Sequence, residues 1–155
     1  MPTAEGSAPA SASQPKQRYK LHWHVVLTHF PVSAFAGAFV FMALHLLTAD
    51  PCMSRASYVT LVASAVVLVP VTFTGWQTWK KTYQGSRTDL FRIKIGISAA
   101  MIPLAAVLAV YYTVYPFERL DPGHGLPHLI YFAGLALLML GAMAEGYYGG
   151  QLHHR

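Results

Sequence analysis

Eight histidines are the side chains of this chain best suited to do chemistry, and all lie on or beside two of its four long apolar segments. Ionisable groups are rare inside membrane-crossing segments and are commonly functional there. Imidazole is also the usual ligand of haem iron and of several transition metals. The distribution therefore favours a cofactor role for some of these histidines, which are His22, His24, His29, His45, His124, His128, His153 and His154.

His45 and His128 are predicted to form a pair of haem-iron ligands. If the first and fourth apolar segments are antiparallel neighbours, two residues at the same membrane depth have position numbers whose sum is nearly constant. His45 and His128 meet this condition near the outer surface. Two imidazoles from facing helices are the ligand set of a bis-histidine haem b. His124, one helical turn before His128, is the alternative ligand. An ordinary interfacial histidine is the competing interpretation for each.

A second haem site is predicted at the inner end of the same two segments. His24 or His22 would meet His153 or His154 there, although their depths match less well than those of the outer pair. The expected content is therefore one or two haems b. Because the chain lacks a Cys-x-x-Cys-His sequence, any haem is held non-covalently by side chains.

Glu145 is matched in depth to His29 near the inner surface. A carboxylate beside an imidazole can bind a quinone headgroup and transfer protons. The sequence therefore suggests a quinone or proton site at these two residues. A simple interfacial hydrogen-bonded pair is the alternative interpretation.

The composition indicates a membrane protein rather than a soluble one. Hydrophobic residues make up 54% of the chain and charged residues only 11%, about half the usual charged fraction. A net charge of +5 raises nucleic acid as a partner of a soluble protein. Here the charges stand between apolar segments, which favours membrane lipid and argues against nucleic acid. The single cysteine, Cys52, excludes a disulfide within the chain.

The apolar segments position the histidines. Each is long enough to cross about 30 Å of hydrocarbon as a helix, which takes about 20 residues. The sequence therefore predicts an all-α fold, an integral membrane four-helix up-down bundle over residues 21–152, after a disordered tail over 1–20. The predicted helices span about 21–47, 58–79, 91–115 and 127–147.

The basic residues predict the orientation of this bundle. Cytoplasmic loops of membrane proteins carry an excess of Lys and Arg. Nine such residues fall on the side of the two termini and the middle loop, and two fall on the other side. Both termini are therefore expected in the cytoplasm. The nine are Lys16, Arg18, Lys20, Lys80, Lys81, Arg87, Arg92, Lys94 and Arg155, and the two are Arg55 and Arg119.

Three short motifs between residues 21 and 152 resemble a known family. The first segment opens with His24-Val-Val-Leu-Thr-His29-Phe-Pro, the second contains Thr74-Gly75, and the fourth ends with Gly146-Tyr-Tyr-Gly-Gly-Gln-Leu152. These resemble the pattern of the domain of unknown function 2231 family, small four-helix proteins of the bacterial inner membrane. The resemblance implies a redox or haem-linked role.

The chain also departs from that family pattern. Val25 stands where the family usually has proline, and Lys94 stands near a position where the family often has histidine. His45 and His128 lie outside the pattern, as expected of a specialised member.

Together these features predict a cytochrome b-like electron-transfer subunit. It would exchange electrons between the quinone pool and larger membrane or periplasmic redox subunits. The short loops leave no soluble catalytic domain, so a subunit of an oxidoreductase complex is expected rather than an enzyme acting alone. The alternative is a non-redox anchor or scaffold of a larger membrane complex, which would bind no cofactor.

Overall fold

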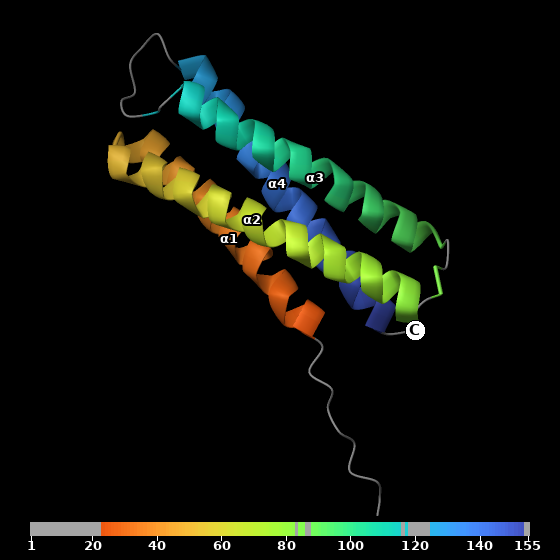
Figure 1. The fold of residues 1–155 in the computed structure, drawn as a ribbon. Coiled ribbons are helices and arrows are strands. Elements are labelled where there is room, and N and C mark those ends of the chain that lie inside the picture. Colours follow the sequence, from red (N-terminus) through yellow and green to blue (C-terminus); the bar gives the residue numbers. More distant parts are fainter. Residues whose placement is uncertain (1–22, 83, 86–87, 116, 118–124, 154–155) are drawn as a thin grey trace, which may run out of the picture.

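Four long helices make up the described part of the chain (Figure 1). The computed structural model describes residues 23–82, 84–85, 88–115, 117 and 125–153, and contains no strand among them. The all-α prediction is confirmed for these residues. The predicted tail over 1–20 lies outside them. The helices are α1 (Trp23–Thr48), α2 (Pro51–Thr82), α3 (Asp89–Val114) and α4 (Gly125–His153).

α2 begins at Pro51 instead of near Tyr58, because the residues expected to form a loop start the helix. The Asp50 carboxylate accepts a hydrogen bond from the backbone N–H of Cys52 at 2.8 Å, as N-cap side chains do. Proline suits the first helical position, since its missing N–H would have no partner there. The α1–α2 connection is therefore only Ala49 and Asp50, and Ala49 turns the chain with a left-handed φ of 56°.

Each helix contacts two others. α1 packs against α2 and α4, and α3 packs against the same two helices, while α1 and α3 do not contact each other within the described ranges. The expectation that the first helix neighbours the second and fourth is confirmed. The start of α1 and the end of α4 lie toward one end of the molecule (Figure 1). We call that end the Lys94 end, and the opposite end, with the α1–α2 turn, the Asp50 end.

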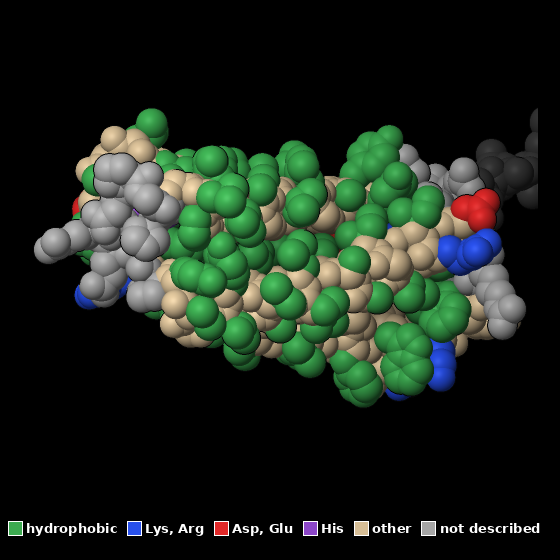
Figure 2. All heavy atoms as spheres, turned by 90° about the horizontal axis from the view of Figure 1, so that it is seen from above, with side chains coloured by type: hydrophobic (Ala, Val, Ile, Leu, Met, Phe, Trp, Pro, Cys, Tyr) green, Lys and Arg blue, Asp and Glu red, His purple; other side chains and the backbone are tan. Residues whose placement is uncertain are grey.

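Apolar side chains fill the centre and also cover the outside. Phe35 and Met42 of α1, Leu61 of α2 and Leu135 of α4 are fully buried in the core. Many equally large apolar side chains point outward, and only 17% to 33% of each apolar span is buried. On the face seen in Figure 2, apolar side chains cover the middle and charged ones gather toward the ends.

All four helices contain a span long and apolar enough to cross a membrane. These spans are His29–Thr48, Pro51–Lys81, Phe91–Val114 and Gly125–Gly149. Their lengths of 20, 31, 24 and 25 residues meet or exceed the approximately 20 residues that a bilayer core requires. The prediction of four long apolar helices is confirmed.

α3 and α4 approach closely because α4 presents glycines to α3. A Cβ added at Gly134 would lie 2.5 Å from the Leu108 side chain, and one added at Gly141 would lie 3.0 Å from Met101 Sδ. Both distances are shorter than ordinary van der Waals contact, so these positions accept no larger residue without a shift. This packing fixes α4, which carries His128, against α3.

Candidate functional site

The structure brings His45 and His128 together at the Asp50 end. His45 lies in the last turns of α1 and His128 in the first turns of α4. Their ring centroids are 5.7 Å apart, with ring planes inclined by 16°. Both side chains are buried, with 0% and 2% of their surface exposed. The equal depth predicted for this pair from an antiparallel arrangement is confirmed.

A backbone carbonyl fixes the orientation of the His45 ring. His45 Nδ1 lies 2.8 Å from the carbonyl oxygen of Asp50. Because a carbonyl oxygen only accepts hydrogen bonds, Nδ1 carries the proton and donates it. In the neutral ring the lone pair is then on Nε2, which is buried and has no hydrogen-bond partner among the described residues. Metal-binding histidines commonly show this pattern, in which the second ring nitrogen donates to a carbonyl.

Aromatic side chains surround the second histidine. The Phe117 ring centroid lies 4.5 Å from the His128 ring centroid and 5.1 Å from the Tyr131 ring centroid. Phe117 and Tyr131 are both buried. Ser54 of α2 donates a hydrogen bond of 2.6 Å to the Phe117 carbonyl oxygen, which ties the segment after α3 to α2. Tyr112 packs against Phe117 edge-on at 5.3 Å. These contacts exclude water from one side of the pair.

Sequence reasoning missed Ser54 and Phe117. Ser54 fell within the predicted first loop, because Asp50-Pro51 was interpreted as a break instead of a helix start. Phe117 lies beyond the predicted third helix, and nothing in the local sequence indicates that it returns to the core. The N-cap pattern at Asp50 indicates a helix start there, which would place Ser54 on α2 instead of in a loop.

Two buried imidazoles from facing helices are a ligand set suited to haem. A closed zinc site takes four ligands, and no group of three or more His, Cys, Asp or Glu side chains suited to a metal ion occurs in the described ranges. Haem iron takes only axial ligands from the protein. Metal–nitrogen bonds of about 2 Å on each side, plus roughly 1 Å to each ring centre, separate the centres by about 6 Å. The observed separation of 5.7 Å is close to this value, while the two rings are stacked with planes inclined by 16°, so binding a haem would require them to turn toward the iron.

The other predicted haem ligands are not brought into a described site. His24 lies on α1 and His153 on α4, and their rings lie outside the described side chains. His22, His124 and His154 lie outside the described residues. The predicted second haem site at the inner end and the alternative role of His124 therefore stay predictions.

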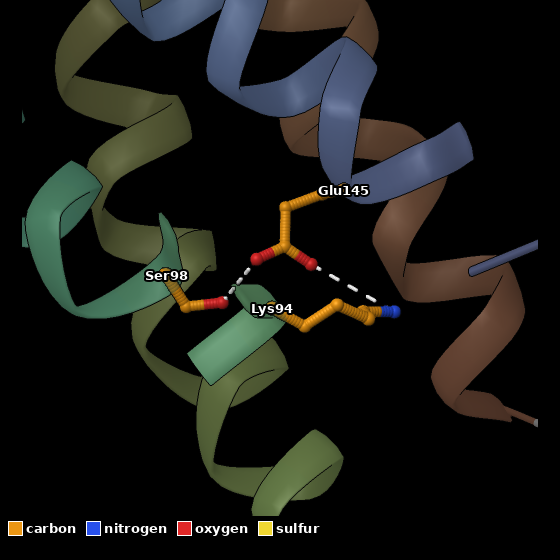
Figure 3. A network of polar contacts seen from close by, with 3 residues as sticks. All are labelled: Lys94, Ser98 and Glu145. Carbon is orange, nitrogen blue, oxygen red and sulfur yellow. Dashed lines mark hydrogen bonds and ion pairs between the residues drawn. The ribbon is translucent and has the colours of Figure 1, made fainter. Parts of the chain in front are cut away.

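The carboxylate of Glu145 faces α3 instead of His29, which differs from the sequence expectation (Figure 3). Ser98 donates a hydrogen bond of 2.6 Å to Glu145 Oε1, and Lys94 Nζ lies 3.8 Å from Glu145 Oε2. His29 is exposed on α1. The depth rule placed Glu145 at the correct end of α4, but it carries no information on which neighbouring helix a side chain faces.

No protein-family model, no curated protein and no solved structure matches this chain. The resemblance to the domain of unknown function 2231 family therefore stays a prediction. The function of the chain has to be argued from the buried histidine pair, the polar cluster at the Lys94 end and the apolar surface.

Proposed function

We propose that this protein is a membrane-embedded cytochrome b-like electron-transfer subunit. It forms a four-helix up-down bundle in the bacterial inner membrane and holds haem b between His45 and His128. It exchanges electrons between the quinone pool and a larger membrane or periplasmic redox subunit.

The placement in a membrane is supported by the apolar outer surface. Burying large apolar side chains such as Val66, with 66% of its surface exposed, and Leu137, with 60%, in lipid removes them from water. The basic residues of the described part concentrate at the Lys94 end, where Lys80, Lys81 and Arg92 lie. Cytoplasmic surfaces attract such residues, so the Lys94 end faces the cytoplasm and both termini lie there.

The buried pair of histidines is the observation that carries the cofactor assignment. A polar ring nitrogen buried without a hydrogen bond costs about 1 to 3 kcal/mol, so His45 Nε2 is costly to the fold unless a ligand satisfies it. The proton on Nδ1 is held by the Asp50 carbonyl, which leaves the Nε2 lone pair available to iron. His128 approaches from the facing helix, and its ring centroid lies 5.7 Å from that of His45.

A bound haem would supply reversible one-electron oxidation and reduction. His45 and His128 would hold it, and the Asp50 carbonyl keeps the His45 ring in a single tautomer and orientation. The buried rings of Phe117 and Tyr131 keep water away from the pair, which favours a stable potential.

A partner subunit is implied by the small extent of the described connections. Ala49 and Asp50 alone join α1 to α2. This connection holds no soluble domain, and the proposed partner is a larger membrane or periplasmic redox subunit.

The assignment of ligands is tested by measuring haem per chain, as a pyridine haemochrome, in purified variants. We expect His45→Ala and His128→Ala each to lose most of the haem that the wild-type chain holds. His29→Ala is the matched control, since His29 is exposed on the same helix as His45, and it should keep the wild-type content. Equal haem content in all four proteins would remove these residues as ligands.

The alternative is a non-redox scaffold, and one observation favours it. His45 already has a structural role, because its hydrogen bond to Asp50 closes the α1–α2 turn. In a scaffold, His45→Ala would lower the unfolding temperature while the wild-type protein contained no haem. The haem measurement therefore separates the two functions.

A further inference from the structure

A polar cluster joins α3 and α4 at the Lys94 end, far from the histidine pair. It consists of Lys94 and Ser98 of α3 and Glu145 of α4. Figure 3 shows the carboxylate lying between the other two side chains. Lys94 keeps 23% and Glu145 22% of the side-chain surface exposed, so the cluster is accessible from outside.

The two contacts of the Glu145 carboxylate differ in strength. Ser98 donates a short hydrogen bond of 2.6 Å to Glu145 Oε1. The distance of 3.8 Å to Lys94 Nζ is an ion pair but is too long for a hydrogen bond. A ligand hydroxyl placed in this gap would accept a hydrogen bond from Lys94 and donate one to the Glu145 carboxylate.

The surroundings of the cluster suit a ligand that is polar at one end only. Lys94 and Glu145 lie inside apolar spans, near the start of Phe91–Val114 and the end of Gly125–Gly149. Ile95 of α3 and Met143 of α4 present 46% and 58% of their surfaces outward. Such a ligand would reach the cluster from the lipid.

We infer that Lys94, Ser98 and Glu145 bind the hydroxyl headgroup of a membrane-soluble quinol, an inference that rests on the proposed electron-transfer function. The opposite charges of Lys94 and Glu145 cancel, so the site suits a neutral ligand. A quinol hydroxyl is neutral, donates and accepts at one oxygen, and is attached to an apolar ring.

The inferred site lies at the opposite end of the molecule from the histidine pair. His128 and Glu145 are 17 positions apart on α4, which corresponds to roughly 26 Å along a helix. Quinol binding at the Lys94 end and haem binding at the Asp50 end can therefore be measured and lost independently.

Binding is tested with the purified full chain and heptylhydroxyquinoline N-oxide, a quinol analogue whose fluorescence is quenched on binding. The wild type should quench one analogue per chain. Glu145→Gln should weaken binding by about ten- to hundredfold, because a charge-assisted hydrogen bond is lost. Ser98→Ala removes one hydroxyl and should weaken it several-fold. Ser33→Ala and Lys81→Met, exposed residues at the same end, are matched controls and should bind as the wild type does.

Equal quenching in all variants, or no quenching by the wild type, would overturn the inference and leave the cluster as an ion pair that joins α3 to α4. Ser98→Ala keeps both charges, so it reports on binding even if Glu145→Gln fails to fold. The haem content of each variant is measured in parallel. Absence of haem from the wild type would be a failure of the proposed function, whereas loss of analogue binding with haem retained is the result expected for the site.

Discussion

His45 uses its two ring nitrogens differently, and this difference is the basis of the cofactor assignment. Nδ1 donates to the Asp50 carbonyl at 2.8 Å, which closes the α1–α2 turn. Nε2 is buried without a hydrogen bond in the described structure, and the His45 ring centroid lies 5.7 Å from that of His128. The geometry of the turn therefore determines where the available lone pair lies. Residues that hold the turn should affect both stability and the position of His45.

Asp50→Ala should lower the free energy of unfolding by about 1 kcal/mol, the usual cost of losing an N-cap side chain. The reason is the hydrogen bond from Cys52 N–H to the Asp50 carboxylate. Thr88→Ala is the matched control, because Thr88 is the N-cap of α3 but makes no side-chain capping bond. Thermal unfolding in detergent measures both. Equal losses in the two variants would contradict the assigned role of Asp50.

At the scale of the helices, the sequence predicted what depends on apolar length and missed what depends on contacts between distant residues. Four long apolar segments predicted four helices, and antiparallel neighbours predicted the equal depth of His45 and His128. The start of α2 was misjudged because Asp-Pro marks both a loop and a helix start. The partner of Glu145 could not be predicted, since it depends on the rotation of α4 toward α3.

Gly134 tests the close packing of α3 and α4. Gly134→Ala should destabilise the protein by about 1 to 3 kcal/mol, because the added methyl group would overlap the Leu108 side chain. Gly96→Ala is the control: a Cβ there meets nothing within 4 Å, and alanine is the better helix former. Adding Leu108→Ala to Gly134→Ala should relieve the overlap. Unfolding temperatures that are the same for Gly134→Ala and Gly96→Ala would argue against this packing.

At the scale of the whole molecule, the proposed orientation places the Asp50 end outside the cell membrane and the Lys94 end in the cytoplasm. The apolar surface lies between these ends (Figure 2). Haem is thereby placed near the outer surface, within reach of a periplasmic partner, and the inferred quinol site lies at the inner surface.

The single cysteine allows this orientation to be measured directly. Cys52 is exposed beside the α1–α2 turn, so a membrane-impermeant maleimide should label it in intact spheroplasts. In Cys52→Ser combined with Gln84→Cys, the new thiol lies in the exposed turn between α2 and α3. It should react only after the membrane is permeabilised. The reverse pattern of labelling would invert the orientation and place the histidine pair on the cytoplasmic side.

We propose that the buried pair of histidines holds haem b. The most direct test is a reduced-minus-oxidised visible spectrum of the full chain, purified in detergent from cells that are not limited for haem. We expect a sharp b-type band with at least one haem per chain. A flat spectrum from well-folded protein would contradict it and leave a non-redox membrane subunit in its place.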